Sequence, residues 1–170
     1  MAVTIPASAD ARVARASPNA NFGTATTLEV DRSPVMESFV AFDVADPGAP
    51  VTRATLRLFV VNQLGNGPKV YRSDTGWAET ALTWNTRPAR HELLADIGSV
   101  TAGHWAAYDV TTAVSGPGPV SFDLVADSTG GTDFSTREAS ANHPELVVET
   151  DTGSPTPPPP PPPPPPSAVG

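Results

Sequence analysis

Short runs in which apolar and polar side chains alternate recur along the chain, and this alternation limits the fold more than any other feature. In the run Arg53–Val61, Leu56 and Leu58 fall on one side while Arg57 and Phe59 fall on the other. A period of two is typical of a β-strand with one buried face. Further runs of this kind are Glu37–Val44, Trp105–Val110, Val120–Ala126 and Pro144–Thr150.

Clusters of turn-forming residues separate these runs. Glycine supplies positive φ angles and proline fixes φ, so each cluster can reverse the chain between two strands. Helical turns are expected only at Thr111–Val114 and around Ala78–Leu82. The pattern predicts an all-β protein, an antiparallel, jelly-roll-like β-sandwich over residues 3–151. The turn clusters are Asp46–Gly48, Gly65–Pro68, Gly116–Pro119 and Ser128–Gly131.

The composition changes abruptly at residue 152. Residues 152–170 include an unbroken proline run from Pro157 to Pro166. Proline fixes φ and lacks a backbone donor, so such a run favours polyproline II at ~3.1 Å per residue. We interpret 152–170 as a proline-rich linker, polyproline II or disordered; a ligand for proline-reading aromatic grooves is the alternative. A linker needs something on its far side, so we expect this chain to be one module of a longer secreted protein.

Charge and cysteine content exclude several classes of function. The chain has 10 basic and 18 acidic residues, a net charge of −8, which argues against nucleic-acid or anionic-membrane binding through bulk charge. No apolar stretch approaches the ~20 residues that span a bilayer. The absence of cysteine excludes disulfides and thiolate metal sites. We expect a secreted, extracellular, monomeric module, with no signal peptide within these residues.

No local motif indicates catalysis. The chain lacks a G-x-S-x-G elbow, an H-E-x-x-H pair and a glycine-rich phosphate loop. His91, His104 and His143 are widely separated and show no metal-ligand spacing. A carboxylate pair contributed by different strands stays open. We expect no enzyme activity from this domain and no required cofactor.

A structural calcium ion is compatible with a few carboxylates. The segment Asp127–Asp133 places two carboxylates and several hydroxyls around a glycine turn, a distant likeness to oxygen-rich calcium loops. A plain hairpin turn accounts for the same residues without a metal. The candidate ligands are Asp10, Asp127 and Asp133.

Two tryptophans bracket one polar segment. Trp77 and Trp84 lie close enough in sequence to form a stacking platform for sugar rings. Alternatively, both rings pin a long loop onto the sandwich by burying their large apolar area. Trp105 and Tyr108 alternate within a strand, so one ring is expected in the core and the other outside.

Three motifs in order give the chain a family resemblance. They are W-x-E-x-x-x-T-W-N-x-x-P from Trp77, Y-D-V-T from Tyr108 and S-x-R-E-A from Ser135. With the flanking strands they resemble the DNRLRE-type domain, which includes carbohydrate-binding module family 96, from about Thr4 to Glu149. The resemblance implies a non-catalytic sandwich that anchors a linked secreted enzyme to its polymer. A structural or adhesive spacer without a sugar site is the alternative.

Described members of that family bind alginate, a polyuronate, through basic side chains. Here nine of the ten basic residues are arginine and the net charge is −8, so a uronate polymer and a neutral polysaccharide both stay open. One predicted site is a polar pocket formed by loops at one end of the sandwich. Alternatively, Arg137 and Glu138 hold these loops together through ion pairs and hydrogen bonds. We expect Phe134–Ala139 to form a strand, with Arg137 on one side and Glu138 on the other. The residues of the predicted pocket are Asn21, Trp84, Asn85, Arg87, Arg137 and Glu138. A second predicted site is an outward sheet face with Arg57, Phe59, Tyr71 and Arg72.

Overall fold

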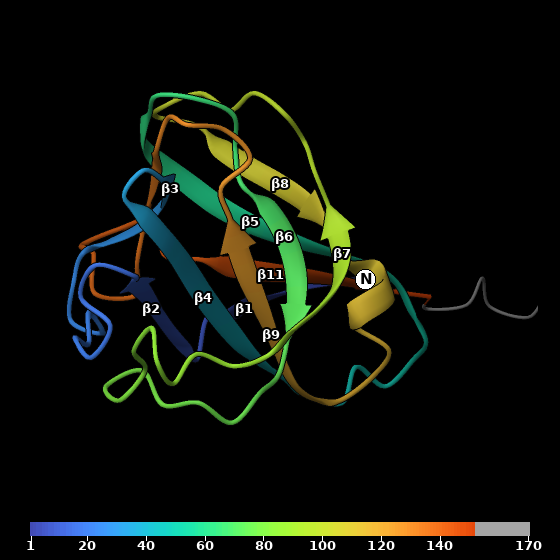
Figure 1. The fold of residues 1–170 in the computed structure, drawn as a ribbon. Coiled ribbons are helices and arrows are strands. Elements are labelled where there is room, and N and C mark those ends of the chain that lie inside the picture. Colours follow the sequence, from blue (N-terminus) through green and yellow to red (C-terminus); the bar gives the residue numbers. More distant parts are fainter. Residues whose placement is uncertain (152–170) are drawn as a thin grey trace, which may run out of the picture.

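The computed structural model describes residues 1–151, which form strands and one short 3-10 turn (Figure 1). The predicted linker, 152–170, lies outside the described residues. The elements are β1 (Ala2–Pro6), β2 (Ala9–Ala14), β3 (Thr27–Arg32), β4 (Val35–Val44), β5 (Val51–Gln63), β6 (Lys69–Ser73), β7 (Arg90–Ala95), β8 (Trp105–Asp109), η1 (Thr111–Ala113), β9 (Gly118–Val125), β10 (Thr132–Ser135) and β11 (Glu145–Thr150).

The strands pair antiparallel in two layers. In the front layer of Figure 1, β4 pairs with β2 and β9, and β6 joins β9 to β7. In the back layer, β5 pairs with β8 and with β11, and β11 pairs with β1. β10 pairs with both β3 and β5, while β3 also pairs with β4, so these strands join the layers. The predicted antiparallel β-sandwich is confirmed.

The main core lies between the layers. Leu56 and Leu58 of β5 are fully buried, and so are Phe42 of β4 and Phe122 of β9, whose ring centroids are 6.2 Å apart. These residues are the inward half of each alternating run, as the period of two requires. Burying one side chain of this size contributes roughly 1.5–3 kcal/mol. The apolar positions of the alternating runs therefore form the main core.

A second, smaller core lies on the outer side of the front layer. The long segment 74–89, between β6 and β7, places Leu82 against Phe39 of β4 and Val13 of β2. Trp77 and Trp84 pack on the same cluster, and Trp77 Nε1 donates to Ser121 Oγ at 2.9 Å. The structure thus favours the loop-pinning interpretation of the two tryptophans. It also confirms that Tyr108 is buried while Trp105 is only half-buried.

Three local expectations differ from the structure. β9 begins at Gly118, so the predicted turn Gly116–Pro119 ends earlier than expected. The segment around Ala78 makes hydrogen-bonded turns without a helix. β10 ends at Ser135, so Arg137 and Glu138 lie in a turn and not on a strand. Among the described residues, no helix is long and apolar enough to cross a membrane.

Candidate functional site

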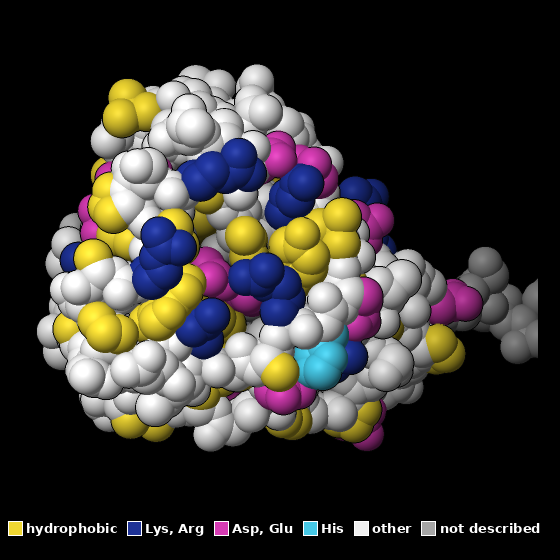
Figure 2. Space-filling model, viewed as in Figure 1, with side chains coloured by type: hydrophobic (Ala, Val, Ile, Leu, Met, Phe, Trp, Pro, Cys, Tyr) yellow, Lys and Arg dark blue, Asp and Glu magenta, His cyan; other side chains and the backbone are white. Residues whose placement is uncertain are grey.

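Basic side chains gather on the outer side of the front layer (Figure 2). Arg90 begins β7, and Arg87 lies just before it in the long segment 74–89. Both converge on Glu37 of β4, and Arg90 also reaches Asp123 of β9. We call the set Arg87, Arg90, Glu37, Asp123, Trp84 and Tyr71 the arginine face.

Two buried carboxylates hold the two arginines in place. Arg90 Nε lies 2.8 Å from Asp123 Oδ2, and its Nη2 hydrogen-bonds Glu37 Oε1. Arg87 Nε lies 3.8 Å from Glu37 Oε2. The carboxylate side chains are only 6 % (Glu37) and 2 % (Asp123) exposed, whereas both guanidinium side chains keep more than a third of their surface exposed. The two carboxylates therefore form the buried floor of the site, and the two arginines form its solvent-facing surface.

Burial gives Asp123 an unusual affinity for a proton. Desolvation, followed by repulsion from Glu37, raises the pKa of Asp123 to about 8, although the hydrogen bond from Arg90 opposes this shift. Asp123 Oδ1 is buried without a hydrogen-bond partner. Asp123 is then largely neutral at pH 7, which leaves the positive charge of the two arginines in excess over Glu37.

Each arginine stacks on an aromatic ring. The Arg87 guanidinium lies 3.7 Å from the centroid of Trp84, and that of Arg90 lies 5.1 Å from the centroid of Tyr71. Cation–π contacts of this kind contribute about 0.5–1 kcal/mol at exposed sites and keep the guanidinium in one orientation. A pocket of about 460 Å³ opens between the two arginines, with Asp123 in its lining. The arrangement offers oriented N–H donors to an anion.

The residues predicted to form one pocket at the loop end lie in two different regions of the structure. Arg137 Nη1 donates to Glu79 Oε1 at 2.9 Å, and Asn21 Nδ2 donates to the Glu79 carbonyl at 2.8 Å. Arg137 lines pockets with Glu79, while Arg87 lines the pocket of the arginine face. The structure thus places Arg137 and Asn21 beside Glu79, and Arg87 and Trp84 together on the arginine face. Asn85 bonds Asn19, which fixes the loop.

The sheet-face prediction placed residues together that the fold separates. Arg57 of β5 lies in the back layer, where it pairs with Glu145 and stacks 4.5 Å above Trp105. Tyr71 of β6 lies in the front layer, so the two side chains do not share a face. Arg72 alternates with Tyr71, shares its side of β6 with buried Val70, and pairs with Glu92. Only Tyr71 of this set joins the arginine face.

The three predicted calcium ligands do not form one site. Asp127 Oδ1 lies 3.5 Å from Lys69 Nζ, and Asp133 lies on β10. Asp10 of β2 instead meets Glu79 and Glu138, and oxygens of the three carboxylates all lie within 4.8 Å of one another. Neither glutamate was predicted as a metal ligand. Glu79 belongs to the W-x-E motif, a signal that could have found it.

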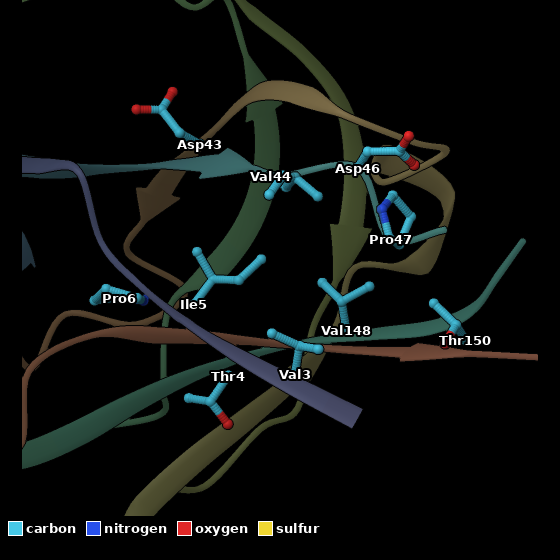
Figure 3. Close-up of a pocket in the computed structure, with 11 residues that line it drawn as sticks. Val3, Thr4, Ile5, Pro6, Asp43, Val44, Asp46, Pro47, Val148 and Thr150 are labelled. Carbon is cyan, nitrogen blue, oxygen red and sulfur yellow. The ribbon is translucent and has the colours of Figure 1, made fainter. Parts of the chain in front are cut away.

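Sequence reasoning missed two further features. One is the set of Glu37, Asp123 and Arg90, in which the two acids lie on β4 and β9 and the arginine begins β7. The other is a groove of about 200 Å³ between β1 and β4. Figure 3 shows Ile5 and Val148 at this groove, while the carboxylates of Asp43 and Asp46 point away from it. Such an apolar lining without converging polar groups does not suit a sugar.

Comparison with models of known protein families gives a match over almost all of the described residues. Residues 1–150 match the family model of carbohydrate-binding module family 96. The match covers both layers of the sandwich, the segment 74–89 and the turn that contains Arg137 and Glu138. No protein among the curated sequences matches the chain.

Proposed function

The chain belongs to carbohydrate-binding module family 96, and from this we propose that it binds a uronate polymer through the arginine face. That it is a carbohydrate-binding module, of a kind that is typically non-catalytic, follows from the family. The choice of a uronate is supported by one observation above all: Arg87 and Arg90 flank one pocket with their guanidinium groups partly exposed.

A guanidinium suits a sugar carboxylate better than a neutral sugar hydroxyl. Its planar fork can donate two parallel hydrogen bonds to one carboxylate. Stacking on Trp84 and Tyr71 holds the two forks in position before the ligand arrives, which lowers the entropy cost of binding.

The net charge of −8 opposes a polyanion only at long range. At physiological salt the Debye length is ~8 Å, so charges farther from the bound sugar are largely screened. Within that distance, the neutral form of Asp123 leaves the face positive. The local field therefore favours a carboxylate even though the whole domain is acidic.

We further propose that the module acts as a secreted monomer that anchors a covalently linked enzyme. Carbohydrate-binding modules are usually extracellular, which supports this location. Linkage raises the effective concentration of a weak module near its polymer without any new contact. Single-site affinities in the micromolar to millimolar range, about −8 to −4 kcal/mol, are then sufficient.

Affinity electrophoresis and calorimetry with alginate, polygalacturonate, xylan and a neutral glucan test this proposal. Arg87→Ala is the main variant, because Arg87 reaches Glu37 only at 3.8 Å, whereas Arg90 pairs with both buried acids and its loss would disturb them more. Arg53→Ala is the matched control, since Arg53 is 61 % exposed on back-layer β5. Charge-assisted hydrogen bonds contribute roughly 1.5–3 kcal/mol, so Arg87→Ala should weaken uronate binding about 10- to 100-fold.

The remaining outcomes are equally informative. Binding to wild-type protein should fall with added salt, and the Arg87→Ala variant should show a smaller salt dependence. If only neutral polymers retain the protein, the ligand is a neutral polysaccharide and not a uronate. No retention by any polymer, with a folded protein, would favour a structural spacer. Equal affinity of the wild-type protein and both variants would place the site elsewhere.

A further inference from the structure

Three carboxylates from distant parts of the chain meet at one point. Asp10 comes from β2, Glu79 from the long segment 74–89, and Glu138 from the turn after β10. One oxygen of each lies within 4.8 Å of the others. We call this set the carboxylate cluster. It is separate from the arginine face and plays no part in the proposed sugar site.

The charges of the cluster are not balanced by the protein. Arg137 Nη1 donates to both oxygens of Glu79, at 2.9 and 3.1 Å. Three carboxylates thus surround one guanidinium, so full ionisation leaves two uncompensated negative charges. A dication would supply the missing charge.

The most buried member of the cluster has an unused acceptor. Asp10 is 1 % exposed, and its Oδ2 accepts a hydrogen bond from the Arg137 backbone N–H at 2.9 Å. Its other oxygen, Oδ1, is buried and has no hydrogen-bond partner. Leaving a buried charged acceptor unsatisfied costs at least as much as a lost hydrogen bond, so such an atom points to a missing ligand.

We propose that Asp10, Glu79 and Glu138 bind one calcium ion. All three donors are carboxylate oxygens, which hard cations prefer, and the cluster holds no thiolate or imidazole ligand. Calcium takes six to eight oxygens in flexible geometry, so waters must complete its shell. They have room, because Glu79 and Glu138 line an open pocket of about 480 Å³.

The bound ion would have a structural role. Glu79 anchors the long segment, since its carboxylate also accepts from the Asp10 backbone N–H at 2.9 Å and its carbonyl accepts from Asn21. A cation shared with Asp10 and Glu138 therefore ties that segment to β2 and to the turn after β10. Because the folded state alone assembles the three ligands, binding adds directly to the stability of the fold.

Equilibrium dialysis and thermal melting of the chelator-treated full chain test the proposal, with CaCl₂ as the probe. Wild-type protein should bind one calcium ion per chain. Its melting temperature should rise by about 5–10 °C at a calcium concentration 100 times the dissociation constant. Glu138→Gln is the main variant, because Glu138 is exposed and its replacement leaves the core intact. It should lose at least 10-fold in affinity and show little calcium-dependent shift.

The controls make the result decisive. Glu149→Gln changes a half-exposed glutamate on β11 and should retain the full wild-type response. Asp10→Asn should abolish binding; if it does not fold, Glu138→Gln carries the test alone. The proposal is overturned if wild-type protein binds no calcium at millimolar concentration. It is also overturned if Glu138→Gln binds calcium as the wild-type protein does, or if only Mg²⁺ or Mn²⁺ is retained.

Discussion

Replacing Asp123 with asparagine should remove a large part of the pH dependence of stability. Asp123 is buried, accepts a hydrogen bond from Arg90 Nε at 2.8 Å and lies beside Glu37. Its pKa in the folded state is about 8, against 3.8 for the ordinary carboxyl. Asparagine has nearly the same shape and keeps an oxygen for Arg90, but it cannot ionise.

The sign follows from proton linkage. A carboxyl with a raised folded-state pKa contributes stability that is fully present below pH 3.8 and is lost as the pH rises through about 8. Between pH 5 and pH 8 the folded state keeps a proton that the unfolded state has released. At 1.36 kcal/mol per pH unit, the loss over this interval is up to about 4 kcal/mol.

Urea unfolding from pH 5 to pH 8 measures this effect as the difference between variant and wild type. Near pH 5, Asp123→Asn should equal wild-type protein or be slightly less stable. Its relative stability should then increase steadily towards pH 8. Asp46→Asn, at an exposed carboxylate, is the control and should run parallel to the wild type. Parallel curves for Asp123→Asn, offset by a constant amount, would refute the assignment of the proton to this residue.

Three other predictions use the same preparations. Uronate affinity of the wild-type protein should fall between pH 6 and pH 9, as Asp123 ionises beneath the arginines, while the affinity of Asp123→Asn stays constant; calorimetry at fixed salt measures both. Phe122→Ala should cost about 3–5 kcal/mol, seen as a lower urea midpoint, because it leaves a cavity in the main core. Trp77→Phe should cost about 1–3 kcal/mol through the lost hydrogen bond to Ser121. It should also speed proteolysis within 74–89; unchanged cleavage would mean that this bond does not hold the segment.

The strands were predictable because each carries its own signal. Leu56 and Leu58 alternate with Arg57 and Phe59, and the structure buries the first pair. Alternation fixes which face is inside but does not say which strand lies beside which. That is why Arg57 and Tyr71 were expected on one face although β5 and β6 belong to different layers.

The arginine face could not be found from local spacing. Glu37, Arg90 and Asp123 come from three strands, and pairing through β9 brings them together. The end of β10 was missed for a different reason. The motif around Arg137 alternates like a strand, but the Asp10 carboxylate accepts from the Arg137 backbone and Thr136 Oγ1 accepts from the Glu138 backbone. Side chains thus replace the strand partner and turn the chain.

The pairing of β1 with β11 decides how the domain responds to mechanical load. Ala2 lies opposite Glu149, and the Thr150 N–H donates to the Met1 carbonyl at 2.9 Å, so the chain enters and leaves the sandwich side by side. A force pulling Met1 away from Asp151 would open the β1–β11 hydrogen bonds one after another, as a zipper opens. A force between a polymer on the arginine face and Asp151 loads the two layers instead. A tether attached after Asp151 would therefore withstand drag from a bound polymer better than the same domain stretched between its two ends.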